Sequence, residues 1–370
     1  MGVNYKEPTL EPDELTLSLI ASGIIRLHET LKNVKAPTLP YPPELQRGLD
    51  RLVLLCLRQR KTPPQGVPDL LDWCRKPLAE WPLELPEEAG SADRLLDGQI
   101  PTSLCDEWAI ISSDIEAELT QKKLLLNVMQ VCQSAAIPDS YVAFRRLLIS
   151  QPVLTSLELV KHGLDPCLER LKDHLNTAYE PAPETYSIDG NFYCCANCGN
   201  LMARTEKGDL ICGEERDRCQ NLGKPGRQIA QREGVYWIKR GIRRFIAAPG
   251  RAELRLADKL KELGLDVDLW PNFDSYDLRI VFPDQEVWAI DVKDWVNPFL
   301  LANKVKKQNP YIPSDPPWQK AYFVFPDARK QQRADYLRAF NHHCTLPKDI
   351  KAKFERDLIK DVKKKLGSIK

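Results

Sequence analysis

The sequence Trp288-Ala289-Ile290-Asp291-Val292-Lys293 predicts a buried β-strand that ends in two charged residues. Side chains on a strand alternate between its faces, so Asp291 and Lys293 share one side. Burying an acid and a lysine at the end of a strand costs free energy, so such a pair indicates a functional role. A divalent cation would supply one: the carboxylate binds the ion, and the lysine neutralises phosphate charge and orients or deprotonates water. The alternative is a surface strand with a salt-bridged pair.

A second carboxylate, Asp277, stands fourteen positions before Asp291. It lies on a strand predicted over residues 276–282, and the short connection through 283–285 predicts a hairpin with the Asp291 strand. The hairpin brings the two carboxylates together, where they repel each other unless a cation lies between them. A site of hard oxygen ligands suits Mg²⁺ or Mn²⁺. Glu253 is a third acid that can contribute directly or through water.

The predicted elements around these acids alternate between helix and strand, which indicates an α/β core with a central mixed sheet. The predicted elements are helix 251–263, strands 265–269, 276–282 and 287–292, helix 300–307 and strand 321–325. Two more helices are expected after strand 321–325, and the basic segment 348–370 is expected to be an amphipathic helix.

A helical glutamate followed by Asp-x13-Asp-x-Lys on two adjacent strands resembles the PD-(D/E)xK nuclease superfamily. The resemblance implies a restriction-endonuclease-like core that cleaves DNA with Mg²⁺ or Mn²⁺. On this basis Asp277, Asp291 and the backbone carbonyl of Val292 would hold the ion. Glu253 and Lys293 would complete the catalytic set.

Three sets of residues narrow the resemblance: Phe245–Leu254, Leu269–Pro271 with Tyr276–Leu278, and Ile290–Trp295 with Asn297 and Pro298. Together they resemble the restriction-endonuclease-like proteins encoded beside prokaryotic Piwi proteins of the RE type. The similarity covers roughly residues 186–345, and the N-terminal part is similar to the accessory domain of that family. Membership implies a three-gene defence island that restricts invading DNA, or RNA–DNA loops, with the prokaryotic Piwi protein and a DinG-like helicase as partners.

Five of the eleven cysteines lie within residues 194–219. Cys195 and Cys198 form a Cys-x2-Cys pair, and Cys212 and Cys219 follow as a looser pair. Four thiolates suit a tetrahedral zinc ion, and a complete set leaves no open position, so the zinc would be structural. Cys194 is an alternative ligand to Cys195. Reduced thiols without metal are the other interpretation.

The net charge of +1 conceals an asymmetry between the two halves of the chain. Residues 1–180 hold 19 Lys and Arg against 26 Asp and Glu, a net of −7, and residues 181–370 hold 34 against 26, a net of +8. A polyanion would therefore be attracted to the C-terminal half. Lys239, Arg240, Arg243 and Arg244 are the candidates for phosphate contact, with a solvated helix face as the alternative.

No apolar run approaches the roughly 20 residues of a membrane span, and the N-terminus lacks the pattern of a secretory signal, so a cytoplasmic protein without membrane contact is expected. We predict an all-α accessory or interaction domain (1–180), a zinc ribbon (186–222), a nuclease core (223–345) and a basic C-terminal helix (346–370). Two other functions are compatible with this organisation: a catalytically silent nucleic-acid-binding subunit and a protein-interaction scaffold.

Overall fold

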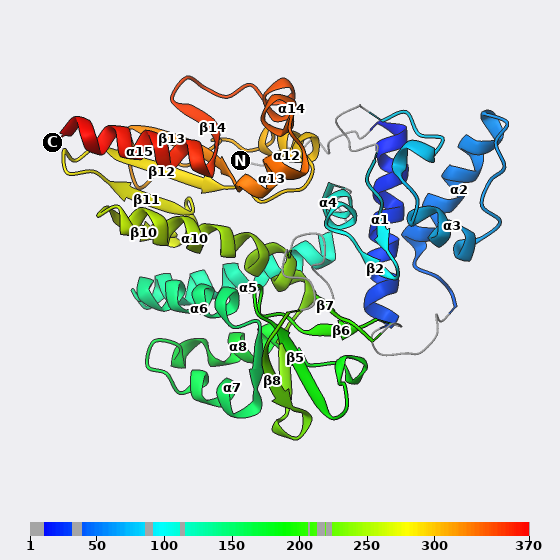
Figure 1. Ribbon diagram of the computed structural model, residues 1–370, viewed down its shortest axis with the longest axis horizontal. Helices are drawn as coiled ribbons and strands as arrows, with labels where there is room; N and C mark the ends of the chain where they lie inside the picture. The colour runs from blue at the N-terminus through cyan, green and yellow to red at the C-terminus, as the bar shows by residue number, and fades with distance from the viewer. Residues whose placement is uncertain are drawn as a thin grey trace. The chain divides into compact units, whose positions relative to one another are not determined.

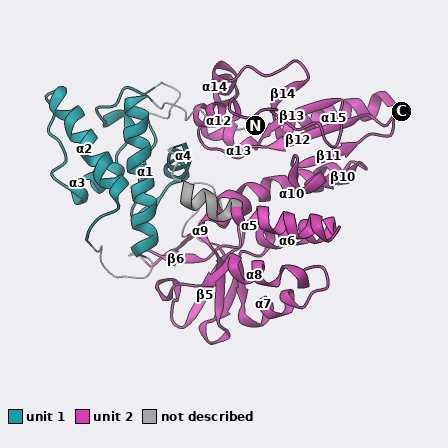
Figure 2. Ribbon diagram, turned by 180° about the vertical axis from the view of Figure 1, so that it is seen from behind, with its two compact units in different colours: residues 1–115 teal, residues 116–370 magenta. Residues whose placement is uncertain are grey.

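The computed structural model describes residues 11–31, 39–85, 92–111, 115–205, 208–212, 219 and 224–369. The side chains of 115–122 and the N-terminal residues used to argue against a signal peptide lie outside this description. The chain forms two compact units, Met1–Ile115 and Glu116–Lys370, which Figure 2 distinguishes by colour. None of the described helices combines the length and apolarity needed to cross a bilayer.

Unit 1 is mainly helical, as predicted. Its first two helices pack closely because glycine meets the neighbouring helix: a Cβ on Gly23 would lie 2.4 Å from the Cβ of Leu45. The segment 92–101 contains a short hairpin. The elements are α1 (Pro12–Leu31), α2 (Pro43–Arg58), α3 (Val67–Cys74), the 3₁₀ turn η1 (Leu78–Glu80), β1 (Leu96–Asp97), β2 (Ile100–Pro101) and α4 (Ser103–Ile111).

Four further helices of the region predicted as the helical domain belong to unit 2. The first of them, α5, follows α4 of unit 1, and residues 112–114 between the two helices lie outside the description. Helix α6 packs in one apolar cluster with residues of the segment 242–247, which explains why it groups with the C-terminal part. The helices are α5 (Ile115–Ser134), α6 (Pro138–Ser150), α7 (Ser156–Gly163) and α8 (Lys172–Ala178).

Three small sheets follow α6 in the chain. An antiparallel sheet of order β3-β9-β4 places the strand after α6 beside the strand before α9. Two further antiparallel pairs, β5–β8 and β6–β7, carry the cysteine cluster. The strands are β3 (Val153–Thr155), β4 (Tyr179–Pro181), β5 (Asn191–Cys195), β6 (Met202–Arg204), β7 (Leu210–Cys212), β8 (Pro225–Ala230) and β9 (Val235–Ile238).

The largest sheet has five strands in the order β10-β11-β12-β13-β14 (Figure 1). The first two pairings are antiparallel and the last two are parallel, so the predicted mixed sheet and its hairpin are present. The prediction of a single helix over 346–370 was wrong: residues 350–354 form the edge strand β14. The strands are β10 (Asp266–Leu269), β11 (Leu278–Val281), β12 (Val287–Val292), β13 (Lys320–Phe325) and β14 (Ile350–Phe354).

Helices cover both faces of this sheet (Figure 1). Strand β12 has Ile290 and Val292 in the cluster with α10 and α15, whereas Ala289 packs with α12 and α14. The C-terminal helix is thus part of the core, because its Leu358 and Val362 are fully buried. The helices are α9 (Arg240–Ile242), the π-helical turn η6 (Arg243–Ala247), α10 (Ala248–Glu262), α11 (Pro271–Asp274), α12 (Pro298–Val305), α13 (Asp327–Gln332), α14 (Tyr336–His343) and α15 (Glu355–Ile369).

Candidate functional site

Asp277 and Asp291 lie beside each other at the end of the β11–β12 hairpin. The last ladder pair joins Leu278 to Ile290, so Asp277, one residue earlier, stands next to Asp291. The backbone N–H of Val292 donates to Oδ2 of Asp277 at 2.6 Å, which holds that carboxylate over the end of β12. Both acids are buried, with exposed fractions of 7% and 9%.

Lys293 points to the same side of the chain as Asp291, as strand alternation predicts. Its Nζ lies 2.6 Å from Oδ1 of Asp291, and its side chain is 21% exposed. Burial lowers the pKa of Lys293, but the charges of Asp291 and Asp277 outweigh burial, so that the pKa is raised and the ammonium form persists.

Glu253 projects from α10 into the same cluster and is engaged on both oxygens. The indole Nε1 of Trp270 donates to Oε2 at 2.5 Å. Nη2 of Arg145 lies 3.0 Å from Oε2 and 3.3 Å from Oε1. Glu253 therefore approaches the two aspartates, but in this structure it is paired with a guanidinium.

Arg145 of α6 is a member of the site that the sequence reasoning missed. Nη2 also lies 3.6 Å from Oδ1 of Asp277, and Nη1 forms an ion pair with Asp274. A signal was present in the pattern of the helix. Buried residues recur on one face of α6 at Tyr141, Phe144 and Leu148, and Arg145 falls on that face.

Burial and the charges of neighbouring carboxylates both act on Asp277 and Glu253. Burial, followed by the charges of Glu253 and Asp291, holds the pKa of Asp277 well above its usual range. Burial also raises the pKa of Glu253, against the opposing effect of Arg145. Asp291 contacts Lys293 through Oδ1, and none of the described residues donates to its Oδ2. Two hard carboxylates with a free oxygen at a partly exposed end fit a divalent cation.

Two family models match this chain. The model described as pPIWI_RE three-gene island domain Y matches residues 16–155, and the model described as REase associating with pPIWI_RE matches residues 250–369. The chain is a pPIWI_RE-associated restriction-endonuclease-like protein. The family expected from the sequence is confirmed, although the nuclease-like match begins and ends later than residues 186–345. No curated protein and no solved structure matches this chain.

The residues of the candidate site in this restriction-endonuclease-like protein come from both matched segments. Glu253, Asp277, Asp291 and Lys293 lie within the REase match, whereas Arg145 lies within the domain Y match. Residues 156–249, which include the cysteine cluster, lie between the two matched segments. The acids therefore come from one recognisable part of the pPIWI_RE-associated chain and the arginine that pairs with them from the other.

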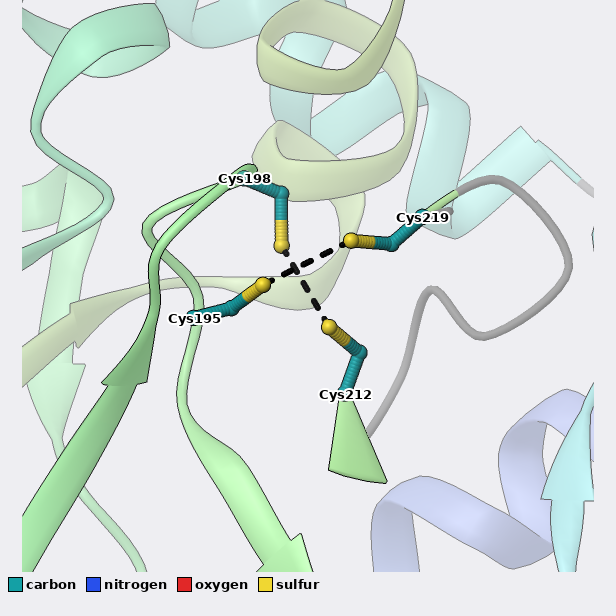
Figure 3. A group of neighbouring side chains, drawn as sticks. All are labelled: Cys195, Cys198, Cys212 and Cys219. Carbon is teal, nitrogen blue, oxygen red and sulfur yellow. Dashed lines mark hydrogen bonds between the residues drawn. The ribbon is translucent and has the colours of Figure 1, made fainter. Parts of the chain in front are cut away.

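Four of the five clustered cysteines of this restriction-endonuclease-like protein converge on one point (Figure 3). The Sγ atoms of Cys195 and Cys219 are 3.5 Å apart, and those of Cys198 and Cys212 are 3.9 Å apart. Sulfurs at about 2.3 Å from a tetrahedral zinc would be about 3.8 Å from each other, whereas a disulfide would bring them to about 2.05 Å. The spacing therefore fits a four-thiolate metal site.

The geometry also shows that Cys195, and not Cys194, faces the cluster of four thiols. Adjacent strand residues face opposite ways, and Cys194 packs in a different apolar cluster with Phe192 and Trp237. Burial raises the pKa of Cys194 to about 11, as for an inert buried thiol. Asn197 supports the cluster of four by donating its backbone N–H to Sγ of Cys195 and its side-chain amide to Sγ of Cys219, both at 3.4 Å.

The predicted phosphate-binding arginines differ from expectation, because the structure buries them. Arg240, Arg243 and Arg244 are 5%, 0% and 2% exposed. Arg243 stacks on Trp237 at 4.0 Å and donates to the carbonyl of Ile238 at 2.7 Å. A fully buried guanidinium offers no surface to a phosphate backbone, so these three residues are not retained as DNA contacts. Lys239 is partly exposed and remains a candidate.

Proposed function

We propose that this restriction-endonuclease-like protein is a metal-dependent endonuclease with a PD-(D/E)xK core that cleaves DNA. The observation that carries the proposal is the pair of buried carboxylates, Asp277 and Asp291, with Nζ of Lys293 at 2.6 Å from Asp291. Both acids occupy the end of one hairpin in a mixed sheet, within the segment matched by the REase family. This constellation supports hydrolysis of phosphodiesters more than a purely structural ion pair.

Each residue has a distinct role in the proposed reaction. Asp277, Asp291 and the carbonyl of Val292 would hold Mg²⁺ or Mn²⁺, which supplies Lewis-acid activation of water and of the scissile phosphate. Lys293 positions the attacking water and balances the charge that develops on the phosphate. Glu253 assists once its carboxylate is released from Arg145. Attack on phosphorus breaks the bond to the 3′ oxygen and leaves a 5′-phosphate and a 3′-hydroxyl.

The biological setting of the proposal rests on the family. The names of both matching models place such proteins with pPIWI_RE, and one of them names a three-gene island. We propose that the substrate is invading DNA, including RNA–DNA hybrid loops, and that the prokaryotic Piwi protein and a DinG-like helicase are the partners.

We also propose that the four-cysteine cluster binds one structural zinc ion. The supporting observation is the pair of Sγ–Sγ separations of 3.5 and 3.9 Å among four buried thiols. All four ligands come from the chain, so the ion would join the ends of β5 and β7 to Cys219 and would have no open position for chemistry.

The test is plasmid cleavage by the purified protein with Mg²⁺ or Mn²⁺, alone and with the two proposed partner proteins. Asp277→Asn and Asp291→Asn are expected to abolish cleavage and divalent-ion binding. Asp266→Asn, which changes an exposed acid of the same sheet, should leave both intact. Full cleavage by Asp291→Asn would refute the mechanism. Retained DNA binding without cleavage by the wild type under every condition would favour the catalytically silent subunit instead.

A further inference from the structure

A guanidinium from the domain Y segment reaches the acids of the REase segment. Arg145 lies on α6, inside the match over residues 16–155, and its side chain is only 7% exposed. Its partners Glu253, Asp274 and Asp277 all belong to the match over residues 250–369. The contact therefore links two parts of the chain that are recognised by separate family models.

The guanidinium of Arg145 lies against Glu253 and Asp277, two acids of the proposed metal site. Nη2 is 3.0 Å from Glu253 and 3.6 Å from Asp277, so one nitrogen is shared by both carboxylates. The plane of Arg145 lies over the ring of Trp270 at 4.6 Å. Its Nε is buried and has no hydrogen-bond partner among the described residues. Leaving a buried donor unpaired opposes folding, so Arg145 is held here by charge and not by a complete set of hydrogen bonds.

The loop that carries Trp270 and Asp274 is in an unfavourable backbone conformation. Trp270, Asn272, Phe273 and Asp274 all have positive φ, at 49°, 47°, 56° and 77°, although none is glycine. Such residues persist where surrounding contacts hold them. Helix α6 supplies those contacts through Tyr141, which meets the ring of Phe273 edge-on and places its hydroxyl 3.4 Å from Oδ2 of Asp274.

Helix α6 packs directly against α10, the helix that carries Glu253. A Cβ added to Gly250 would lie 2.4 Å from Cδ1 of Ile149, so the absence of a side chain at this position allows the close approach. Arg145, the strained loop and α10 therefore form one packed assembly. The helix that packs on α10 therefore also carries the guanidinium to the acids, and a movement of α6 away from α10 would withdraw it.

We propose that Arg145 is an inhibitory cation that competes with the divalent metal for Glu253 and Asp277. This inference rests on the proposed metal site. The guanidinium and the ion supply positive charge to the same carboxylates, so docked Arg145 lowers the affinity for the ion and a bound ion repels Arg145. By linkage, any event that shifts α6 away from α10 raises the metal affinity of the site. The domain Y segment thereby controls whether the REase segment binds the divalent ion.

The experiment measures Mn²⁺ binding to the full-length protein by calorimetry, with thermal unfolding as a check of folding. Arg145→Met is expected to bind Mn²⁺ about tenfold more tightly than the wild type, within the usual range of coupling between sites. Asp274→Asn removes the Nη1 partner of Arg145 without changing a proposed metal ligand, and it should tighten binding in the same direction. Arg146→Met is the matched control, because Arg146 is the exposed neighbour on the same helix.

The outcomes separate this inference from the proposed function. Unchanged or weaker Mn²⁺ binding by folded Arg145→Met would overturn the inhibitory role and make Arg145 an organiser of the site. If Arg145→Met does not fold, Asp274→Asn decides by the same criterion. Binding that is absent in the wild type and in both variants, or that survives Asp291→Asn, would overturn the metal site itself. An Arg145→Lys protein that binds like the wild type would confirm that charge is the operative property.

Discussion

Nη2 of Arg145 lies 3.0 Å from Oε2 of Glu253, although the two residues are 108 positions apart in the chain. The pair is almost fully buried, with side-chain exposures of 7% and 3%. Removing one partner of such a pair leaves a buried charge uncompensated, which usually costs about 3–5 kcal/mol. The nuclease-like segment is therefore expected to depend on α6 for its stability as well as for the electrostatics of its acids.

Lys293→Ala should separate metal binding from chemistry. The ammonium contacts Asp291 from the partly exposed side, so its loss leaves the carboxylates in place. We expect Mn²⁺ binding to persist while DNA cleavage falls by about 10²- to 10⁴-fold, the usual contribution of a positioned proton-transfer group. Cleavage rates and calorimetry on the same preparation test this. Lys306→Ala changes an exposed lysine directly after α12; it is the control and should cleave normally.

One zinc per chain should be found in the purified protein, and Cys198→Ser should lose it. Ligand loss is expected to cost several kcal/mol, because binding free energy in such sites is folding free energy. Cys194→Ser is the control: it changes the adjacent buried thiol that packs outside the cluster, and it should retain the metal. Elemental analysis of both variants decides, and equal zinc content in the two would contradict the assignment.

Gly250→Ala should destabilise the protein even though alanine is the better helix former. The helix preference favours Ala by about 0.5–1 kcal/mol, but overpacking against Ile149 costs about 1–3 kcal/mol. Ile149→Ala removes the clashing atoms at the cost of a cavity. A double-mutant cycle by denaturant unfolding should therefore show a favourable coupling of about 0.5–3 kcal/mol between the two changes. Strict additivity would mean that α6 and α10 do not pack as described.

Arg243→Met should reduce stability and leave the salt dependence of DNA binding unchanged. Loss of the contact with Trp237 and of the hydrogen bond to Ile238 should cost about 2 kcal/mol. A phosphate contact would instead lower the slope of log affinity against log salt by about one unit. Binding titrations at several salt concentrations, compared with Lys239→Met, distinguish the two roles. A reduced slope for Arg243→Met alone would restore the original surface interpretation.

Glu286 should contribute to stability in mild acid. Hydrogen bonds from Lys320 and Lys365 lower its pKa from an ordinary 4.5 to about 2 in the folded protein. Its contribution is therefore present above pH 4.5 and lost as the pH falls from 4.5 towards 2. Because both lysines are partly solvated, the contribution is about 1 kcal/mol or less. Glu286→Gln should flatten the pH dependence of unfolding in this window, whereas Glu262→Gln, at an exposed end of α10, should not.

Local pattern alone was enough to predict the strand 287–292 with its exact bounds and the side shared by Asp291 and Lys293. Strand alternation is a property of consecutive residues, so it needs no knowledge of the rest of the fold. The Cys-x2-Cys pair and the hairpin before Asp291 were predictable for the same reason. The edge strand at 350–354 was missed because its Lys-rich sequence matches an exposed helix as well as a parallel edge strand.

Tertiary structure decided the features that depend on distant residues. Sequence reasoning left Cys194 and Cys195 as alternatives, and the direction in which each thiol faces within the folded strand pairs separated them. The arginines at 240–244 have the composition of a phosphate-binding surface, but packing against Trp237 and the core buries them. Arg145 joined the acid cluster for the same physical reason. The period of α6 could have placed Arg145 on a buried face, but its partner 108 residues away is set by which elements meet in space.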